Sequence, residues 1–109
     1  MGASGLGDFE QLILLAVLQL GADAYAAEIR TRIERAADRR VTRGALYATL
    51  DRLVAKRFLD WEEEDATPAR GGIPRRRFRL TAAGLTALKR SYQAVRSLAH
   101  GFDRQLRET

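Results

Sequence analysis

The segment FEQLILLAVLQL, residues 9–20, is the feature that most limits what this chain can fold into. Asp8 can cap a helix at its start, Gln11 is the third residue of that helix, and Gly21 is a usual stop residue. We therefore predict a helix over residues 9–20. Its middle is apolar almost all the way round, whereas a helix at the surface of a monomer keeps a polar face. The helix must lie at the centre of the core, or a second subunit must cover one of its faces.

Length and composition exclude several classes of protein. A chain of 109 residues, 46 % of them hydrophobic, forms one modest core and not two. It has no cysteine, and its single histidine, His100, cannot form a metal site alone, so we expect no metal and no cofactor. The apolar run at residues 12–18 is far shorter than a membrane span, and no basic residue precedes it as in a signal peptide. We expect a cytoplasmic protein that does not bind membranes.

Helical spacing continues in two further segments. Residues 22–40 form an amphipathic pattern whose apolar positions are Tyr25, Ile29, Ile33 and Ala36 or Ala37. The next helix follows a capping residue, Thr42, and ends near Lys56 or Arg57. Its apolar stripe consists of Leu46, Leu50, Leu53 and Val54.

From Phe58 onwards the pattern changes to short alternating segments. FLDWEEED and PRRRFRL, residues 58–65 and 74–80, have strand character, and the intervening ATPARGGI contains loop residues, namely Pro68, Gly71 and Gly72. We predict a β-hairpin whose register the sequence leaves open, and we expect Trp61 to anchor it to the core.

A last helix can begin after Thr81, which is a suitable cap. It would run for about 25 residues, roughly twice the mean helix length. Its apolar positions are Leu85, Leu88, Tyr92, Val95, Leu98 or Ala99, Phe102 and Leu106. A helix this long on a small domain needs a partner to cover its apolar stripe, and an earlier end at Gly101 is the alternative.

Three helices, a hairpin and a last helix make a mainly α chain with a small β-hairpin, the layout of a winged helix-turn-helix. In this fold the third helix enters the major groove of DNA, and the hairpin, or wing, reaches the flanking backbone. We predict an N-terminal arm (residues 1–7), a winged helix-turn-helix DNA-binding domain (residues 8–81) and a C-terminal dimerisation helix (residues 82–109). A protein-protein interaction module that uses a basic face is the alternative. We expect no enzyme, because no nucleophile with a partner base and no paired carboxylates can be found.

The charge favours a polyanion as partner. The net charge is +5, and residues 1–29 contain no lysine or arginine. All but two of the 19 basic residues are arginine, whose planar guanidinium forms paired hydrogen bonds with phosphate and guanine. We therefore expect double-stranded DNA ahead of a membrane surface.

The third helix offers a face for that partner. With its leucines turned to the core, the residues that lie wholly or partly outside, or in the first turn, are Thr42, Arg43, Gly44, Tyr47, Ala48, Thr49 and Arg52. N–H groups at a helix N-terminus suit phosphate, Gly44 permits close backbone approach, and Ala48 lets the helix lie deep in the groove. The alternative is that Arg43 and Arg52 are solvated surface charges and that Tyr47 packs partly in the core.

The hairpin supplies further arginines, and their roles can be ranked by position. We expect Arg70 and Arg75 to contact phosphate at the tip, Arg76 and Arg77 to be further candidates, and Arg79 to be structural. The alternative is an ion-pair ladder with the acidic residues of the first strand, Asp60, Glu62, Glu63, Glu64 and Asp65.

Four segments in order resemble the PadR family of bacterial transcriptional regulators. LILLAVL resembles the family's first helix, and GADAYAAEI resembles its G-x-x-x-G-Y-E-I motif. GALYATLDRLVAKRFL resembles the block G-x-L-Y-x-x-L-x-x-L-x-x-x-G-x-[LIV], and GGIPRRRFRLTAAG resembles the wing with its Y-x-L-T-x-x-G end. The resemblance covers residues 6–88. Ala26 and Ala27 stand where the family often has Gly-Tyr, Arg57 stands where it has Gly, and Phe78 replaces a Tyr.

The resemblance implies a homodimer that binds a pseudo-palindromic operator, usually as a repressor, and that in some members is released by a small hydrophobic effector. Gly44 and Tyr47 match the family's recognition helix, whereas the wing arginines match by residue type alone. A single helix after the wing resembles the branch with a short C-terminus. The residues that we expect at the dimer interface are Leu12, Leu15, Leu85, Leu88, Tyr92, Val95, Phe102 and Leu106.

Overall fold

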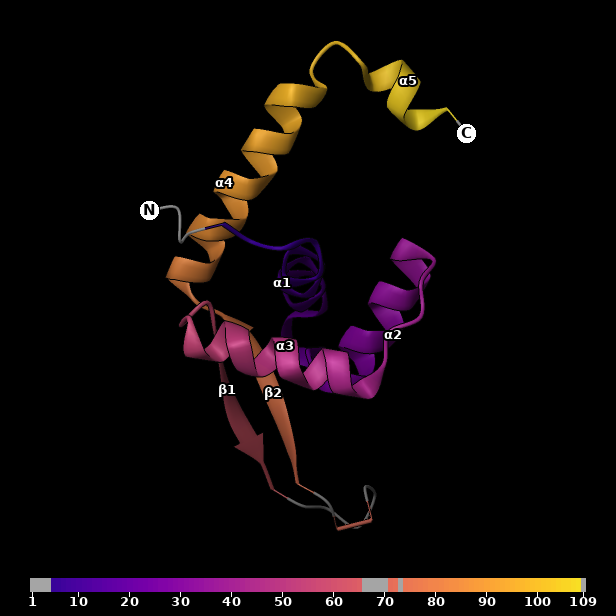
Figure 1. The fold of residues 1–109 in the computed structure, drawn as a ribbon. Helices are drawn as coiled ribbons and strands as arrows, with labels where there is room; N and C mark the ends of the chain where they lie inside the picture. The colour runs from indigo at the N-terminus through magenta and orange to yellow at the C-terminus, as the bar shows by residue number, and fades with distance from the viewer. Residues whose placement is uncertain (1–4, 66–70, 73, 109) are drawn as a thin grey trace.

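The computed structural model describes residues 5–65, 71–72 and 74–108 (Figure 1). Its elements are α1 (Asp8–Leu20), the 3₁₀ turn η2 (Gly21–Asp23), α2 (Ala26–Ala37), α3 (Arg43–Ala55), β1 (Leu59–Glu64), β2 (Arg75–Leu80), α4 (Ala82–Ala99) and α5 (Asp103–Arg107). The hairpin and α4 extend in opposite directions from a body made by the first three helices. This architecture confirms the predicted winged helix-turn-helix. Residues 1–4 of the predicted arm lie outside the described residues.

Helix α1 lies at the centre of the core. It packs against α2, α3, α4 and β2, and the side chains of Ile13 and Leu14 are fully buried. Leu15 and Leu18, on the other side of the helix, are 43 % and 53 % exposed. The explanation by a central position therefore accounts for one face of the helix, whereas cover of the other face by a second subunit stays a prediction.

The start of α1 differs slightly from the prediction. The N-cap is Gly7 and not Asp8, and the Gly7 N–H donates to Glu10 Oε1 at 2.9 Å. Glu10 is buried, and its Oε2 accepts a hydrogen bond from Lys56 Nζ at 2.8 Å. Burial raises the pKa of Glu10, but the hydrogen bonds from Lys56 and Gly7 outweigh it and hold that pKa below its usual value. This ion pair joins the start of α1 to the end of α3.

Short polar contacts fix the turn between α2 and α3. Asp38 ends α2 with a left-handed backbone, and the Val41 N–H donates to Glu34 Oε2 at 2.9 Å. Thr42 caps α3 as predicted, because its hydroxyl accepts a hydrogen bond from the Ala45 N–H at 3.1 Å. The capped turn sets the direction of α3 relative to α2.

The hairpin strands are antiparallel, with Leu59 opposite Leu80 and Glu64 opposite Arg75. The expectation that Trp61 anchors the hairpin is wrong, because its side chain is 37 % exposed. Its cross-strand neighbour Phe78, which is 3 % exposed, is the aromatic residue in the core. Both residues lie on one face of the hairpin, and the one nearer the body becomes buried.

The base of the wing is joined closely to α4. The Thr81 hydroxyl donates to the Arg57 carbonyl oxygen at 2.7 Å and accepts from the Gly84 N–H at 2.9 Å. Arg57 has a φ of 64°, a left-handed conformation that favours glycine, which is the residue the family usually has there. Gly84 lies so near Phe58 that an added Cβ would be 2.1 Å from the Phe58 carbonyl oxygen.

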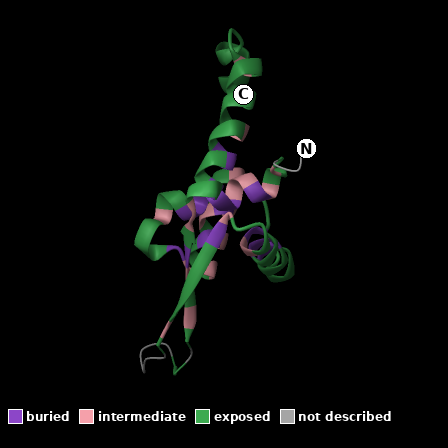
Figure 2. Ribbon diagram, turned by 90° about the vertical axis from the view of Figure 1, so that its left-hand side faces the viewer, coloured by how far each residue is buried: buried purple, intermediate pink, exposed green. Residues whose placement is uncertain are grey.

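The last helix is shorter than we predicted. A continuous helix through residue 106 is wrong: α4 ends at Ala99, Gly101 has a φ of 88°, and α5 follows in a new direction. The far half of α4 and all of α5 are largely exposed (Figure 2). The alternative end near Gly101 is therefore the correct one.

We expect Gly84→Ala to lower the free energy of unfolding by about 2–3 kcal/mol, because the new methyl group must displace the Phe58 backbone. Urea denaturation followed by circular dichroism measures this. Gly44→Ala is the matched control, since nothing lies within 4 Å of an added Cβ there. It should raise stability by about 0.5 kcal/mol through helix propensity, and equal effects at the two glycines would contradict the close contact.

Candidate nucleic-acid interface

The exposed face of α3 carries most of the residues that the sequence assigns to it. Leu46, Leu50 and Leu53 are buried, as their spacing predicts. The predicted contacts that lie exposed in the structure are Thr42, Arg43, Gly44, Tyr47, Ala48 and Arg52. The helix therefore presents arginine, hydroxyl and small side chains on one side and leucines on the other.

Thr49 does not lie on this face. It is 5 % exposed, and its hydroxyl donates to the Ala45 carbonyl oxygen at 2.8 Å. It is three residues after Leu46 and four before Leu53, so it belongs to the buried stripe. Its polar side chain is tolerated there because the helix backbone satisfies the hydroxyl. The prediction that Thr49 faces DNA is therefore wrong.

The N-terminal turn of α3 concentrates donor groups. The Arg43 guanidinium carbon lies 5.6 Å from the centre of the Tyr47 ring, one turn further along. Thr42 caps the Ala45 N–H, and the N–H groups of Arg43 and Gly44 have no partner within the helix. Free N–H groups at a helix N-terminus are suited to a phosphate oxygen.

One face of the wing is an ion-pair ladder. Arg79 Nε lies 3.1 Å from Asp60 Oδ1, and Arg77 binds Glu62 and lies 3.6 Å from Glu64. The hydrogen bond from Arg77 lowers the pKa of Glu62, and in return that bond raises the pKa of Arg77. The ladder that we gave as an alternative is therefore present for these arginines.

Arg75 and Arg76 lie on opposite sides of β2. The Arg75 guanidinium carbon is 3.5 Å from the centre of the Tyr25 ring, and its Nε is 3.6 Å from Glu64 Oε1. The Arg76 guanidinium carbon lies 4.2 Å from the centre of the Trp61 ring, and Arg76 is exposed. Among the described residues no acidic side chain pairs with it. Arg70 lies outside the described residues.

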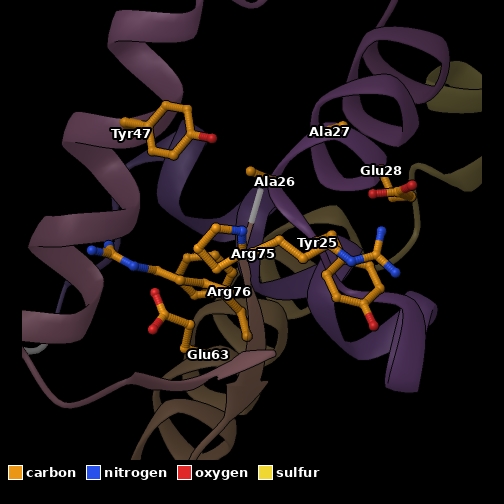
Figure 3. A pocket seen from close by; sticks show the side chains of 10 residues that line it. Tyr25, Ala26, Ala27, Glu28, Tyr47, Glu63, Arg75 and Arg76 are labelled. Carbon is orange, nitrogen blue, oxygen red and sulfur yellow. The ribbon is translucent and has the colours of Figure 1, made fainter. Parts of the chain in front are cut away.

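A cleft of about 360 Å³ separates the wing from the helices (Figure 3). Tyr47 of α3 borders it on one side, Tyr25 and the first turn of α2 border it on another, and Arg75 and Arg76 border it from β2. The recognition helix and the wing therefore share one recess, with hydroxyl and guanidinium groups on its walls.

The positive charge is greater in the segment that contains α2, α3 and the turns after them than in the hairpin region. Residues 26–57 contain nine basic and four acidic residues, whereas the hairpin region, residues 58–80, contains five of each. The cross-strand register, which the sequence leaves open, shows how the acidic residues of the hairpin pair with its arginines.

Exposed apolar side chains also lie on α1, on α4 and at α5. Of the residues expected at a dimer interface, those exposed are Leu15, Leu85, Tyr92, Val95, Phe102 and Leu106. Leu18 and Leu98 are exposed as well, although the sequence analysis did not place them among the expected interface residues. Leu12 packs partly against the core. Leu88 is 4 % exposed and belongs to the core of its own subunit, because it lies on the side of α4 that faces α1.

Residues 14–90 match the model of the transcriptional regulator PadR-like family. The chain belongs to the PadR-like family. It is therefore a DNA-binding transcriptional regulator. No match is found among curated proteins.

Solved structures agree with this assignment. A PadR-like transcription factor from Bacteroides fragilis is 28 % identical, with a TM-score of 0.70 over 88 % of this chain and 87 % of that one. A PadR family regulator from Clostridium difficile R20291 is 23 % identical, with a TM-score of 0.72 over 92 % and 99 %. A PadR-like regulator from Bacillus cereus is 20 % identical, with a TM-score of 0.71 over 93 % of each chain. The latter two show the likeness of fold.

The described residues contain no helix long and apolar enough to cross a membrane. In the same part of the chain, no three His, Cys, Asp or Glu side chains are grouped so that they could hold a metal ion.

We expect Arg76→Ala to weaken binding to every DNA sequence alike and to reduce the slope of log K against log salt by about one, because one phosphate contact is lost. Arg79→Ala is the control, since Asp60 already pairs with that arginine. Fluorescence anisotropy titrations at several salt concentrations measure both slopes. Equal slopes for wild type and Arg76→Ala would show that Arg76 makes no phosphate contact.

Proposed function

We propose that the chain is a sequence-specific, homodimeric repressor that binds a pseudo-palindromic operator. The observation that carries this proposal is the face of α3, where Arg43, Tyr47 and Arg52 are exposed while the leucines are buried. In a winged helix-turn-helix this face of the third helix enters the major groove. The protein would act in the cytoplasm, where bacterial DNA lies.

The groups on α3 suit different parts of the DNA. The residues proposed to read base edges are Arg43 and Arg52, and guanine is the base that best fits the guanidinium fork. The small side chain of Ala48 lets the helix approach the bases closely. The contacts proposed at backbone phosphates come from Thr42, Gly44 and Tyr47.

On the wing, Arg76 is the phosphate contact that we favour, because it is exposed and no acidic partner is described for it. Arg75 and Arg77 are held by neighbouring groups within the protein, so their contacts with DNA would be secondary. We propose Arg70 as a further phosphate contact because of its position in the sequence, between the two strand segments.

The exposed apolar residues of α1, α4 and α5 support a homodimer. Scattered apolar side chains are common at protein surfaces, but Leu85, Tyr92 and Val95 recur at helical spacing on one side of α4. A second copy suits this stripe, because a two-fold axis would place the two α3 helices in successive major grooves, about 34–36 Å apart. The segment at residues 82–109 would then serve dimerisation.

Occupancy of an operator explains repression without further chemistry, because a bound dimer excludes other proteins from the promoter. Family resemblance supports release by a small hydrophobic effector, and the exposed aromatic side chains of Tyr92 on α4 and Phe102 just before α5 are the groups that we propose to contact it. A protein-protein interaction module that uses the basic face of α2 and α3 remains the second candidate, supported by the charge of residues 26–57.

Selection of genomic fragments by the immobilised wild type tests the proposal. We expect a small set of fragments that share an inverted repeat, bound at least about 1,000-fold more tightly than unrelated DNA at physiological salt. Arg43→Ala should cost about 1–3 kcal/mol on the selected site and little on unrelated DNA. Retention of fragments without a shared sequence, all bound equally, would favour the interaction module.

We expect Val95→Glu to convert the dimer to a monomer, because it places a charge on the apolar stripe, where the wild-type side chain is 57 % exposed. Ser97→Glu adds the same charge about 160° away around α4, and it should leave the dimer intact. Sedimentation equilibrium should give twice the 12.2 kDa chain mass for wild type and Ser97→Glu. A wild type that sediments as a single chain would refute the homodimer.

A further inference from the structure

Two backbone contacts attach the end of η2 to the wing. The Phe78 N–H donates to the Ala24 carbonyl oxygen at 2.9 Å, and Tyr25 forms an isolated antiparallel bridge with Arg77. The chain that leads into α2 therefore lies along β2 as a short additional strand. It places the Tyr25 side chain beside the ladder face of the hairpin.

The Tyr25 side chain makes a second attachment, further out on the wing. Its hydroxyl lies 2.9 Å from both carboxylate oxygens of Glu64, to which it donates. The Arg75 guanidinium lies over the Tyr25 ring, and Arg75 and Arg77 both lie 3.6 Å from the Glu64 carboxylate. Glu64 is the last residue of β1 and Arg75 is the first residue of β2. This contact therefore holds the hairpin at the end of its strands that is farther from α4.

These contacts act at the opposite end of the strands from the base of the wing. Thr81, Arg57 and Gly84 fix the base, where the hairpin joins α3 and α4. A hairpin held at its base alone can bend, because a two-stranded ribbon has little stiffness of its own. The backbone contacts of Ala24 and Tyr25 hold the middle of β2, and the Tyr25 hydroxyl supplies the outermost attachment to the body.

The cleft shows what this attachment controls. Arg75 lies along the Tyr25 ring, while Arg76, the next residue, leaves β2 on the other side (Figure 3). Adjacent residues of a strand point to opposite faces, so holding Arg75 against Tyr25 fixes the direction of Arg76. Arg76 and Tyr47 of the recognition helix border the same cleft.

We propose that Tyr25 is a positioning residue for DNA binding: through Glu64 and Arg75 it holds the outer wing so that Arg76 meets the DNA backbone while α3 lies in the groove. This inference rests on the proposed function and adds a role for a residue that does not itself touch DNA. This role depends on the Tyr25 hydroxyl, because it donates a hydrogen bond to the Glu64 carboxylate at the end of β1.

The test compares Tyr25→Phe with Arg76→Ala and with the double variant. The probe is a DNA duplex chosen from the fragments that the wild type retains. It is long enough to extend past the positions where the wings of both subunits would contact it. Tyr25→Phe keeps the ring and the net charge, and we expect it to weaken binding about 3- to 10-fold and to lower the salt slope by about one. Arg76→Ala should then cost little more in the Tyr25→Phe background. Fully additive losses would overturn the proposal.

A second pair of variants separates position from charge. Glu64→Gln and Asp60→Asn each remove one negative charge from the same face of β1, but Asp60 pairs with Arg79 and lies away from Tyr25. We expect Asp60→Asn to bind DNA as well as the wild type or better, and Glu64→Gln to bind more weakly despite its gain in net charge. Equal affinities for these two variants would overturn the proposal, even if Tyr25→Phe failed to fold.

The only tryptophan of the chain, Trp61 on β1, reports on the wing without DNA. We expect its fluorescence anisotropy to fall in Tyr25→Phe and in Glu64→Gln but not in Asp60→Asn, and an unchanged value in all three would contradict the attachment. If the wild type bound no DNA specifically, the proposed function would fail while this measurement still decided whether Tyr25 holds the wing.

Discussion

The packing of α1 is the constraint on which the rest of the structure depends. Ile13 and Leu14 are buried where the other helices and β2 meet, and Glu10 pairs with Lys56 at the end of α3. The directions of the recognition helix and of the wing are therefore both set by a helix that has no part in the DNA face. Because Leu15 and Leu18 lie on the open side of that helix, one element joins the proposed DNA face to the exposed apolar residues that we propose for the dimer.

Helical periodicity predicted α1, α2 and α3 to within a few residues, because leucine and isoleucine at threes and fours must share one buried side. Predictions of burial were wrong for a polar residue and for an aromatic residue, whose surroundings depend on contacts that periodicity does not describe. Thr49 lies in the buried stripe because a backbone carbonyl satisfies its hydroxyl. Trp61 and Phe78 share a hairpin face, and only the distance from the body decides that Phe78 enters the core.

The wing was the least predictable part, since its chemistry depends on register and on contacts far apart in sequence. Arg75 and Arg76 are neighbours in the chain and identical in type, but one is held by Tyr25 and the other is exposed. No local pattern reveals that Tyr25 reaches a glutamate 39 residues away. The fold could therefore be predicted from the sequence, whereas the contacts of Arg75, Arg76, Arg77 and Arg79 within the protein needed the structure.

The balanced charge of the hairpin region separates long-range attraction from final contact. Screening at physiological salt limits electrostatic attraction to about 8–10 Å, and within that range a region with five acidic and five basic residues exerts little net pull on DNA. The excess of basic residues at positions 26–57 would draw and orient the protein first. The wing would then make its own contact only at short range, through Arg76, after the recognition helix has reached the groove.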